Sequence, residues 1–409
     1  MGKEQEVIVC IGFPTWEDNY TKSTVELMKV ISKHIPVVYV NYPFTFKDVF
    51  SGMKGQHRIP WKAILGWAPS TQQDGKVTVL YPPAFLPNQF LSKGFLFNWS
   101  SQWNAKRLIG RLTKHLAAKQ LKPLAIVNAF NPFVGAYYPD GFREKYPQIY
   151  YCYDEINQTQ WSGKHGGYLE TLFLTQTQGH IFSSAPLQKS KSTPGKPSFL
   201  VKNGVDFSLF NQANIPISKR GEQDRALYIG AMDDRLDYPL LNYLAAQLPK
   251  WQFDFFGPVK SDAFHQLVQQ HQNINYKGNF PAAEIPVQIT KHHIGLIPFV
   301  RNAFTKNIYP LKINEYLAAG LNVVTTPFGD LSDFESTVYF GNSHESFLSS
   351  LRQARKQLND EQVLKNASFA SHNSWSSRGE AFLKAVAEIT QNNQGIINEK
   401  KNIETAKFK

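Results

Sequence analysis

Short runs of β-branched and other apolar residues alternate with longer amphipathic stretches, and this alternation constrains the fold more than any other feature of the sequence. The order is typical of βαβ units around a parallel sheet. In the first half the expected strands are Val7–Ile11, Val37–Val40, Val77–Leu80, Ala125–Val127, Ile149–Cys152, His180–Phe182 and Phe199–Val201. In the second half they are Ala226–Ile229, Phe253–Phe256, Ile274–Tyr276, Ile294–Ile297, Asn322–Thr325 and Val338–Phe340.

Helical periodicity fills intervals between these strands in both halves. The expected helices are Lys22–His34, Asn104–Gln120, Tyr168–Gln178, Pro239–Leu248, Ala263–His271, Ala282–Lys291, Leu311–Ala319, Glu345–Gln357 and Glu361–Ala370. The sequence therefore predicts an α/β protein with two Rossmann-like, doubly wound domains that face one another across a cleft.

Domain boundaries are placed where the periodicity stops. Asn, Pro, Ser and charged residues accumulate between Asp206 and Arg225, which is typical of a linker. We expect an N-terminal domain over 1–205 and a C-terminal domain over 206–372. A helix over 373–391 is expected to pack back on the N-terminal domain, and 392–409 is expected to be a flexible tail.

The composition excludes several classes of protein. Hydrophobic residues make up 42% of the 409 residues and charged residues 19%, so the chain is not of the disordered class. No apolar run approaches the roughly 18 residues that span a bilayer. The apolar stretch 7–13 follows an acidic lead without a small-residue cleavage site, so it is interpreted as a strand. The two cysteines, Cys10 and Cys152, lie far apart in apolar runs, which excludes a disulfide framework and favours a cytoplasmic location.

The net charge of +12 is concentrated in the first half. Residues 1–200 hold 22 Lys and Arg against 12 Asp and Glu, whereas 201–409 hold 22 against 20. The excess indicates an anionic partner such as an acidic membrane surface or a phosphorylated lipid. Because no nucleic-acid-binding motif occurs in the first half, no nucleic-acid partner is expected.

One long stretch, 42–103, breaks the alternation and is dense in aromatic residues, prolines and lysines. A structureless insertion of this size is usually functional, and basic residues beside aromatic ones suit a membrane interface. The alternative is that the aromatic side chains pack the first core. We expect most of them to do so, with one or two exposed.

The most specific motif is Asn307-Ile-Tyr-Pro310-Leu-Lys312-Ile-Asn-Glu315-Tyr-Leu-Ala-Ala-Gly320. Proline near the first helical position and glycine after the last define a short helix between two strands. Its N-terminus suits a phosphate, Lys312 adds a charge there, and Glu315 lies one turn further, suited to a ribose diol. The alternative is an ordinary amphipathic helix. Together, at this spacing, the residues favour a nucleotide.

Other nucleotide and metal motifs do not occur. The sequence contains no Walker A motif, no Gly-x-Gly-x-x-Gly and no His-Glu-x-x-His. No histidine pairs with a carboxylate or cysteine at metal-ligand spacing, so no metal and no cofactor are expected.

A second motif, Val201-Lys-Asn203-Gly204-Val-Asp206-Phe-Ser-Leu-Phe210, precedes a glycine loop at Gly230-Ala231. With the Pro310–Gly320 segment, these residues resemble the GT-B glycosyltransferases of the group-1 type, close to teichuronic-acid and exopolysaccharide glycosyltransferases. The similarity in layout covers most of residues 5–390 and is specific in the second half.

The resemblance implies a nucleotide-sugar donor, expected to be a UDP-sugar, in the second domain. It implies a saccharide or lipid-linked saccharide acceptor in the first domain and action at the inner face of the cell membrane. In the donor site it implies that Glu315 binds the ribose, that Lys312 binds the diphosphate, and that backbone groups complete the phosphate cradle. These groups, and those near the base, belong to Gly230, Ala231, Pro310, Leu311, Asn279 and Phe280.

Two departures leave the stereochemistry open. Many retaining members have a glutamate eight residues before the one corresponding to Glu315, where this chain has Asn307. They also have a basic residue directly after the glycine loop, where only Arg235 is available. If the enzyme inverts, it needs a carboxylate to take the acceptor proton, and Asp154, just after a strand of the first sheet, is the candidate base. If it retains, Asp154 orients the acceptor or caps a helix.

Two other functions stay open on the sequence. A nucleotide-sugar epimerase shares this fold and turns over the donor without an acceptor. A non-catalytic binding subunit descended from a transferase agrees with Asn307 but not with Glu315, Lys312 and Asp154.

Overall fold

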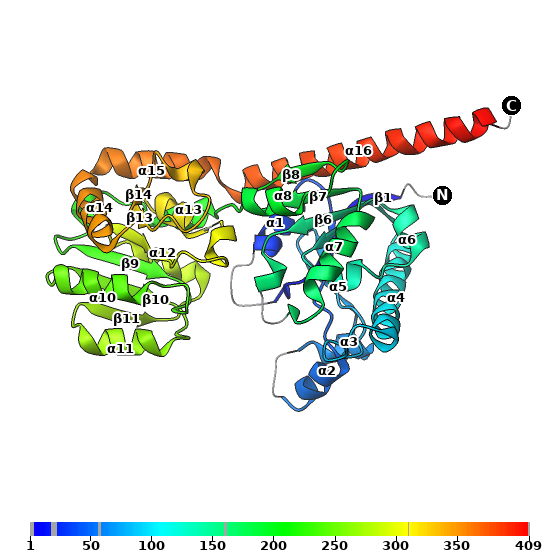
Figure 1. Ribbon diagram of the computed structural model, residues 1–409, viewed down its shortest axis with the longest axis horizontal. Helices are drawn as coiled ribbons and strands as arrows, with labels where there is room; N and C mark the ends of the chain where they lie inside the picture. The colour runs from blue at the N-terminus through cyan, green and yellow to red at the C-terminus, as the bar shows by residue number, and fades with distance from the viewer. Residues whose placement is uncertain (1–3, 18–22, 56–58, 159–161, 310, 408–409) are drawn as a thin grey trace. The chain divides into compact units, whose positions relative to one another are not determined.

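The computed structural model describes residues 4–17, 23–55, 59–158, 162–309 and 311–407 (Figure 1). The chain forms two compact units. Unit 1 contains Met1–Val201 and Gly379–Lys409, and unit 2 contains Lys202–Arg378. The first boundary therefore lies after Val201, four residues before the position assigned from the sequence.

Unit 1 is built on an eight-stranded sheet with the order β3-β4-β2-β1-β5-β6-β7-β8. All its strand pairs are parallel except β3 with β4. The chain moves from β1 outward to one side and then to the other, so the order reverses between β1 and β5. The strands are β1 (Gln5–Gly12), β2 (Val37–Val40), β3 (Thr71–Asp74), β4 (Val77–Leu80), β5 (Leu121–Ala129), β6 (Gln148–Cys152), β7 (Gly179–Phe182) and β8 (Ser198–Leu200).

Parallel strands need helical crossovers, and helices cover the sheet (Figure 1). Strands β2, β6 and β7 are buried along their whole length, as expected for strands covered on both faces. The helices of unit 1 before the return segment are α1 (Ser23–Ile31), α2 (Phe46–Met53), α3 (Trp61–Leu65), α4 (Phe95–Ala118), α5 (Pro132–Gly135), α6 (Asp140–Lys145), α7 (Gly166–Gln176) and α8 (Ala185–Lys191).

The stretch 42–103 is more ordered than the sequence suggests. Besides β4, which the sequence predicts, it holds α2, α3 and β3, and α4 begins at Phe95, nine residues before the expected start. Helix α2 is closed by a capping box, in which Asp48 N–H donates to Thr45 Oγ1 and Thr45 N–H donates to Asp48 Oδ2. The prediction of a structureless insertion is wrong. The start of α4 has apolar residues on its exposed face as well, which hides the helical period, whereas the apolar residues of α2 have the regular helical spacing.

The expectation of one or two exposed aromatic side chains is also wrong. Tyr81, Phe85 and Phe97 are buried. Trp67, Phe90, Phe95 and Trp99 are exposed, with 69%, 75%, 80% and 51% of their surface accessible.

Unit 2 is built on a six-stranded parallel sheet with the order β11-β10-β9-β12-β13-β14. Its strands are β9 (Arg225–Ile229), β10 (Gln252–Phe256), β11 (Ile274–Gly278), β12 (Ile294–Ile297), β13 (Asn322–Thr325) and β14 (Tyr339–Phe340). Its helices are α9 (Phe207–Phe210), α10 (Tyr238–Gln247), α11 (Asp262–Gln270), α12 (Ile285–Ile289), α13 (Leu311–Ala318), α14 (His344–Gln357) and α15 (Asp360–His372).

The last helix, α16 (Trp375–Lys407), begins in unit 2 and continues in unit 1. At its start a Cβ on Gly204 would lie 2.9 Å from Trp375 N, so glycine is required at that crossing. Within unit 1 the Phe382 ring packs edge-on against Tyr151 at 5.3 Å between centroids. The helix continues through 392–407, where the sequence analysis expects a flexible tail, because no proline interrupts 375–407.

None of the helices in the described part of the chain is both long and apolar enough to span a membrane.

Candidate active site

The carboxyl ends of β9 and β12 border the point at which the strand order of unit 2 reverses. Ligands of open parallel sheets bind in the crevice at such a point. Gly230 directly follows β9, and Phe299 lies two residues after β12. The residues that the sequence assigns to a donor site therefore begin at the expected edge of this sheet.

The ends of β9, β10 and β11 are packed backbone to backbone. Gly230 N–H donates to Phe256 O, and Gly257 N–H donates to Gly278 O, both at 2.8 Å. A Cβ on Gly257 would lie 2.3 Å from Gly230 O. Glycine is therefore needed after β10 so that the turn after β9 can take its position.

Lys312 of α13 lies directly against Gly230. A Cβ on Gly230 would lie 2.6 Å from Lys312 Cε and 2.9 Å from the Tyr228 hydroxyl oxygen. Gly230 also has a φ of +150°, which side chains rarely adopt. The Lys312 ammonium lies 5.8 Å from the centre of the Tyr228 ring. The fold thus brings together the glycine loop and the lysine that the sequence motifs place 82 residues apart.

Lys312 and Glu315 are half-buried neighbours on α13. Burial lowers the pKa of Lys312, and the Glu315 carboxylate opposes that shift. Burial likewise raises the pKa of Glu315, and the Lys312 ammonium opposes it. Each charge is thus poorly solvated and only partly compensated by the other, which favours a ligand with a negative group for Lys312 and hydroxyl donors for Glu315.

Arg235 also contributes to this charge group. It binds Asp233 through two parallel hydrogen bonds, from Nε to Oδ1 at 2.8 Å and from Nη2 to Oδ2 at 2.7 Å. Burial alone would raise the pKa of Asp233, but the hydrogen bonds and charge of Arg235 outweigh it and hold the pKa below its ordinary value. The charge of Arg235 in turn helps to lower the pKa of Lys312. Arg235 and Lys312 therefore affect one another electrostatically, and Asp233 opposes the effect of Arg235 on Lys312.

The other predicted donor residues are less concentrated. Ala231 O accepts a hydrogen bond from the Tyr228 hydroxyl at 3.2 Å, next to Gly230. Leu311 is the first residue of α13 and is half-buried, and Pro310 lies outside the described residues.

Three further predicted residues are Asn307, Asn279 and Phe280. Asn307 ends a 3-10 helix, and its Nδ2 donates to Ala303 O at 3.1 Å. Asn279 is exposed just after β11. Phe280 packs on the core with its ring 6.1 Å from that of Phe256.

Asp154 lies in unit 1, two residues after the end of β6. Its Oδ1 accepts a hydrogen bond from Glu155 N–H at 2.8 Å. The neighbouring Glu155 carboxylate is paired with Lys191 at 3.0 Å, and Lys191 is also paired with Glu170 at 2.5 Å. Glu155 is therefore part of a charge network with Lys191 and Glu170.

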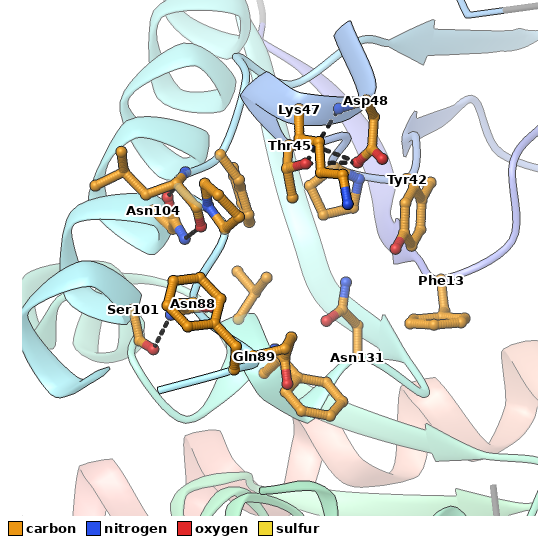
Figure 2. A pocket seen from close by; sticks show the side chains of 17 residues that line it. Phe13, Tyr42, Thr45, Lys47, Asp48, Asn88, Gln89, Ser101, Asn104 and Asn131 are labelled. Carbon is orange, nitrogen blue, oxygen red and sulfur yellow. Dashed lines mark hydrogen bonds between the residues drawn. The ribbon is translucent and has the colours of Figure 1, made fainter. Parts of the chain in front are cut away.

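A cavity of about 560 Å³ opens in unit 1 where the segments after β1, β2, β4 and β5 meet α4 (Figure 2). Apolar and aromatic side chains make up most of its wall, which is typical of ligand pockets. Its polar lining includes Thr45, Lys47, Asn88, Ser101, Asn104 and Asn131.

The three amides in this cavity differ in what they bind. Asn88 donates to Ser101 Oγ at 2.8 Å, and Asn104 bonds both the N–H and the carbonyl of Leu86. Asn131 is buried, with 2% of its surface accessible, and its Nδ2 has no hydrogen-bond partner. Figure 2 shows Lys47 and Asn131 pointing toward one another across the cavity. A buried amide donor without a partner is costly, so this cavity is suited to a ligand oxygen.

Sequence reasoning did not identify Lys47 or Asn131. The one available signal is Asn131-Pro132 directly after the apolar run that forms β5, at the sheet edge where ligands bind. A second cavity of about 530 Å³ shares Phe13 and Tyr42 with the first and is bordered by Tyr153, the neighbour of Asp154. The described residues contain no group of three or more His, Cys, Asp and Glu side chains arranged to hold a metal ion.

The chain has two sheets of doubly wound order, and candidate ligand-binding residues lie at the carboxyl edge of each sheet. This fold is that of the GT-B glycosyltransferases. The chain is similar in structure to sucrose-phosphate synthase from Thermosynechococcus elongatus, with a TM-score of 0.66 and 11% identity over 95% of this chain and 100% of that one. It is also similar to the UDP-forming α,α-trehalose-phosphate synthase of Burkholderia vietnamiensis, with a TM-score of 0.65 and 13% identity over 95% and 99% of the two chains.

In sequence the chain is similar to the putative teichuronic acid biosynthesis glycosyltransferase TuaH of Bacillus subtilis (strain 168). The two are 28% identical over 171 residues, which are 39% of this chain and 43% of that protein. No family model matches the sequence. The resemblance to GT-B glycosyltransferases that the motifs indicate is thus confirmed.

Proposed function

We propose that the protein is a glycosyltransferase that moves a sugar from a nucleotide-sugar to a saccharide or lipid-linked saccharide acceptor in cell-surface polysaccharide synthesis. The observation that carries this proposal is the contact of Gly230 with Lys312 at the switch point of unit 2, with Glu315 one turn along α13. The similarity to a putative teichuronic acid biosynthesis glycosyltransferase supports the role in polysaccharide synthesis. The similarity to a UDP-forming synthase supports UDP as the nucleotide.

In this proposal each residue of unit 2 has a role set by its chemistry. Lys312 and Arg235 neutralise the diphosphate and stabilise it as it leaves, so no metal ion is required. Glu315 accepts hydrogen bonds from the ribose hydroxyls. The backbone at Gly230 and Ala231 and the start of α13 at Pro310 and Leu311 complete the phosphate site.

The base and the donor sugar would lie on either side of this phosphate site. Asn279 and Phe280, after β11, would contact the base. Asn307, which precedes α13, would contact the donor sugar.

Unit 1 would hold the acceptor. Its hydroxyl oxygen attacks the anomeric carbon of the donor sugar, the bond from that carbon to the phosphate oxygen breaks, and the nucleoside diphosphate leaves with the electron pair. If the enzyme inverts the anomeric carbon, Asp154 takes the proton of the attacking hydroxyl. We further propose that the acceptor is reached at the inner face of an anionic membrane.

The first test is calorimetry with UDP and GDP on the wild type, Glu315→Ala and the control Glu335→Ala. Glu335 is an exposed glutamate of unit 2 outside the predicted site. We expect UDP to bind the wild type and the control equally and Glu315→Ala about 10- to 150-fold more weakly, the range for hydrogen bonds to a charged group. Failure of both nucleotides to bind would overturn the proposal in favour of a non-catalytic protein.

The second test separates transfer from epimerisation. UDP-sugars are incubated with and without a saccharide acceptor, and UDP release and sugar configuration are followed by chromatography. We expect UDP release to depend on the acceptor. Conversion of the donor to its epimer without an acceptor would refute the transferase proposal.

A further inference from the structure

Exposed aromatic side chains are concentrated in one part of unit 1. Six of the seven in the described residues lie between 46 and 99, and the seventh is Tyr276. Where such side chains form one large contiguous patch, the patch usually marks a surface for a partner. The six, which we call the aromatic surface, are Phe46, Phe50, Trp67, Phe90, Phe95 and Trp99.

Side-chain contacts join the elements that carry the aromatic surface. The Arg107 guanidinium of α4 lies 5.9 Å from the ring centre of Phe46 in α2. Arg111, one turn further along α4, donates to Ile64 O in α3 at 3.2 Å. Trp67 packs edge-on against Trp61 of α3 at 5.6 Å. Through Arg107 and Arg111, α4 thus contacts both α2 and α3.

The charge of the chain is concentrated on the same elements. Residues 42–122 contain twelve Lys and Arg but only two Asp and no Glu, whereas the rest of 1–200 is balanced at ten against ten. Exposed lysines lie close to rings of these elements. Lys54 Nζ lies 4.6 Å from the ring centre of the exposed Phe50, and Lys62 Nζ lies 5.5 Å from that of the half-buried Trp61.

This combination fits a lipid bilayer better than a protein. Lysine is depleted in protein interfaces, whereas rings flanked by Lys and Arg are typical of segments that lie at the boundary between head groups and acyl chains. The twelve-to-two charge ratio is complementary to anionic lipid. The large unit 1 cavity is lined by both Phe90, of the aromatic surface, and Lys47, one residue after Phe46.

We propose that unit 1 docks on an anionic membrane through the aromatic surface, so that its cavity receives the head group of a membrane-embedded acceptor directly from the bilayer. The docking step is argued from the exposed rings and the charge of the aromatic surface alone. That the ligand of the cavity is an acceptor rests on the proposed function.

The docking step is tested by sedimentation of the full chain with vesicles of phosphatidylcholine alone or mixed with phosphatidylglycerol. We expect binding only to the mixed vesicles, weakened by salt. The double variant Phe50→Ser/Phe95→Ser should bind at least about tenfold more weakly, because each exposed ring loses its apolar contact with lipid. The control Leu364→Ser removes an equally exposed apolar side chain from α15 in unit 2 and should bind like the wild type.

The position of the cavity is tested with a single fluorescent label. Both native cysteines are buried, so a thiol-reactive, polarity-sensitive dye will label an introduced cysteine selectively. With Phe90→Cys we expect a blue shift and gain in emission on adding mixed vesicles. With Leu364→Cys we expect neither. An unshifted signal at Phe90→Cys despite vesicle binding would overturn the placement of the cavity at the bilayer.

Calorimetry with UDP on the same samples separates the two proposals. UDP binding without vesicle binding refutes membrane docking but supports the transferase proposal. Vesicle binding without UDP binding supports docking but refutes the transferase proposal. Equal binding to both vesicle types, or full binding by Phe50→Ser/Phe95→Ser, would also refute docking on this surface. So would a dimer in sedimentation velocity that this double variant dissociates, since a second copy would then cover the rings.

Discussion

The contact between Gly230 and Lys312 makes the substitution Gly230→Ala a sharp test of the donor site. The new methyl group would lie 2.6 Å from Lys312 Cε and 2.9 Å from the hydroxyl oxygen of the buried Tyr228. The Tyr228 ring is fully enclosed, whereas Lys312 is half-buried at the end of a flexible chain. The lysine is therefore the group that moves.

Two costs follow from the geometry. A side chain at a φ of +150° costs about 1–3 kcal/mol of stability. For a unit of this size that lowers the unfolding temperature by about 2–4 °C per kcal/mol. Displacing the Lys312 ammonium from the diphosphate costs about 1.5–3 kcal/mol of binding, or about 10- to 150-fold in Kd for UDP.

Gly221→Ala is the matched control. Gly221 has a φ of +86°, and a Cβ there would have no atom within 4 Å, so this variant carries the backbone strain without the clash. We expect Gly221→Ala to lose stability but to bind UDP like the wild type, and Gly230→Ala to lose both. Calorimetry and thermal unfolding on the three proteins measure this. Wild-type UDP affinity in Gly230→Ala, or an equal loss of affinity in Gly221→Ala, would refute the role given to the contact.

Three further predictions test other parts of the molecule. Because burial holds the pKa of Lys312 below its ordinary value, UDP affinity should fall as the pH rises through that lowered pKa, before an ordinary lysine titrates near about 10.4; calorimetry across pH checks this, and Lys312→Met should flatten the profile. Asp154→Asn should keep UDP affinity and, if the enzyme inverts, slow transfer about 10²- to 10⁴-fold in a steady-state assay, so loss of UDP binding would contradict its assignment to the acceptor side. Gly295→Ala should destabilise unit 2 by about 1–3 kcal/mol, because its Cβ would lie 2.2 Å from the Tyr316 ring, whereas Gly141→Ala, with open space around it, should leave thermal unfolding nearly unchanged.

Most strands could be predicted because a parallel sheet is covered on both faces. Strands such as β6 and β12 are buried at every residue, so each is a continuous apolar run that the sequence shows directly. Strand β3 was missed for the opposite reason. Its sequence Thr-Gln-Gln-Asp is polar and mostly exposed at the sheet edge, and only the Asp74-Gly75 turn into β4 marks the hairpin.

The candidate site was predictable where it depends on local spacing. Lys312 and Glu315 are three residues apart on one helix, so the sequence alone places them together. The cavity of unit 1 was not predictable in this way. Lys47 and Asn131 are 84 residues apart, and neither belongs to a local motif. They are recognised only in the folded chain, where four chain segments come together around the cavity and the Asn131 amide has no hydrogen-bond partner.

The failure of pattern reasoning at the start of α4 has a physical cause that bears on function. Amphipathic periodicity identifies a helix because one face meets the core and the other meets water. In α4, Phe97 is buried while Phe95 and Trp99 are exposed, so the first turns have apolar residues where the rule requires polar ones. In α2 the apolar residues have the regular helical spacing, but Phe46 and Phe50 are exposed. Local rules are violated chiefly at functional sites. The rings that conceal the start of α4 from the sequence thus belong to the face that unit 1 turns to the membrane in our proposal.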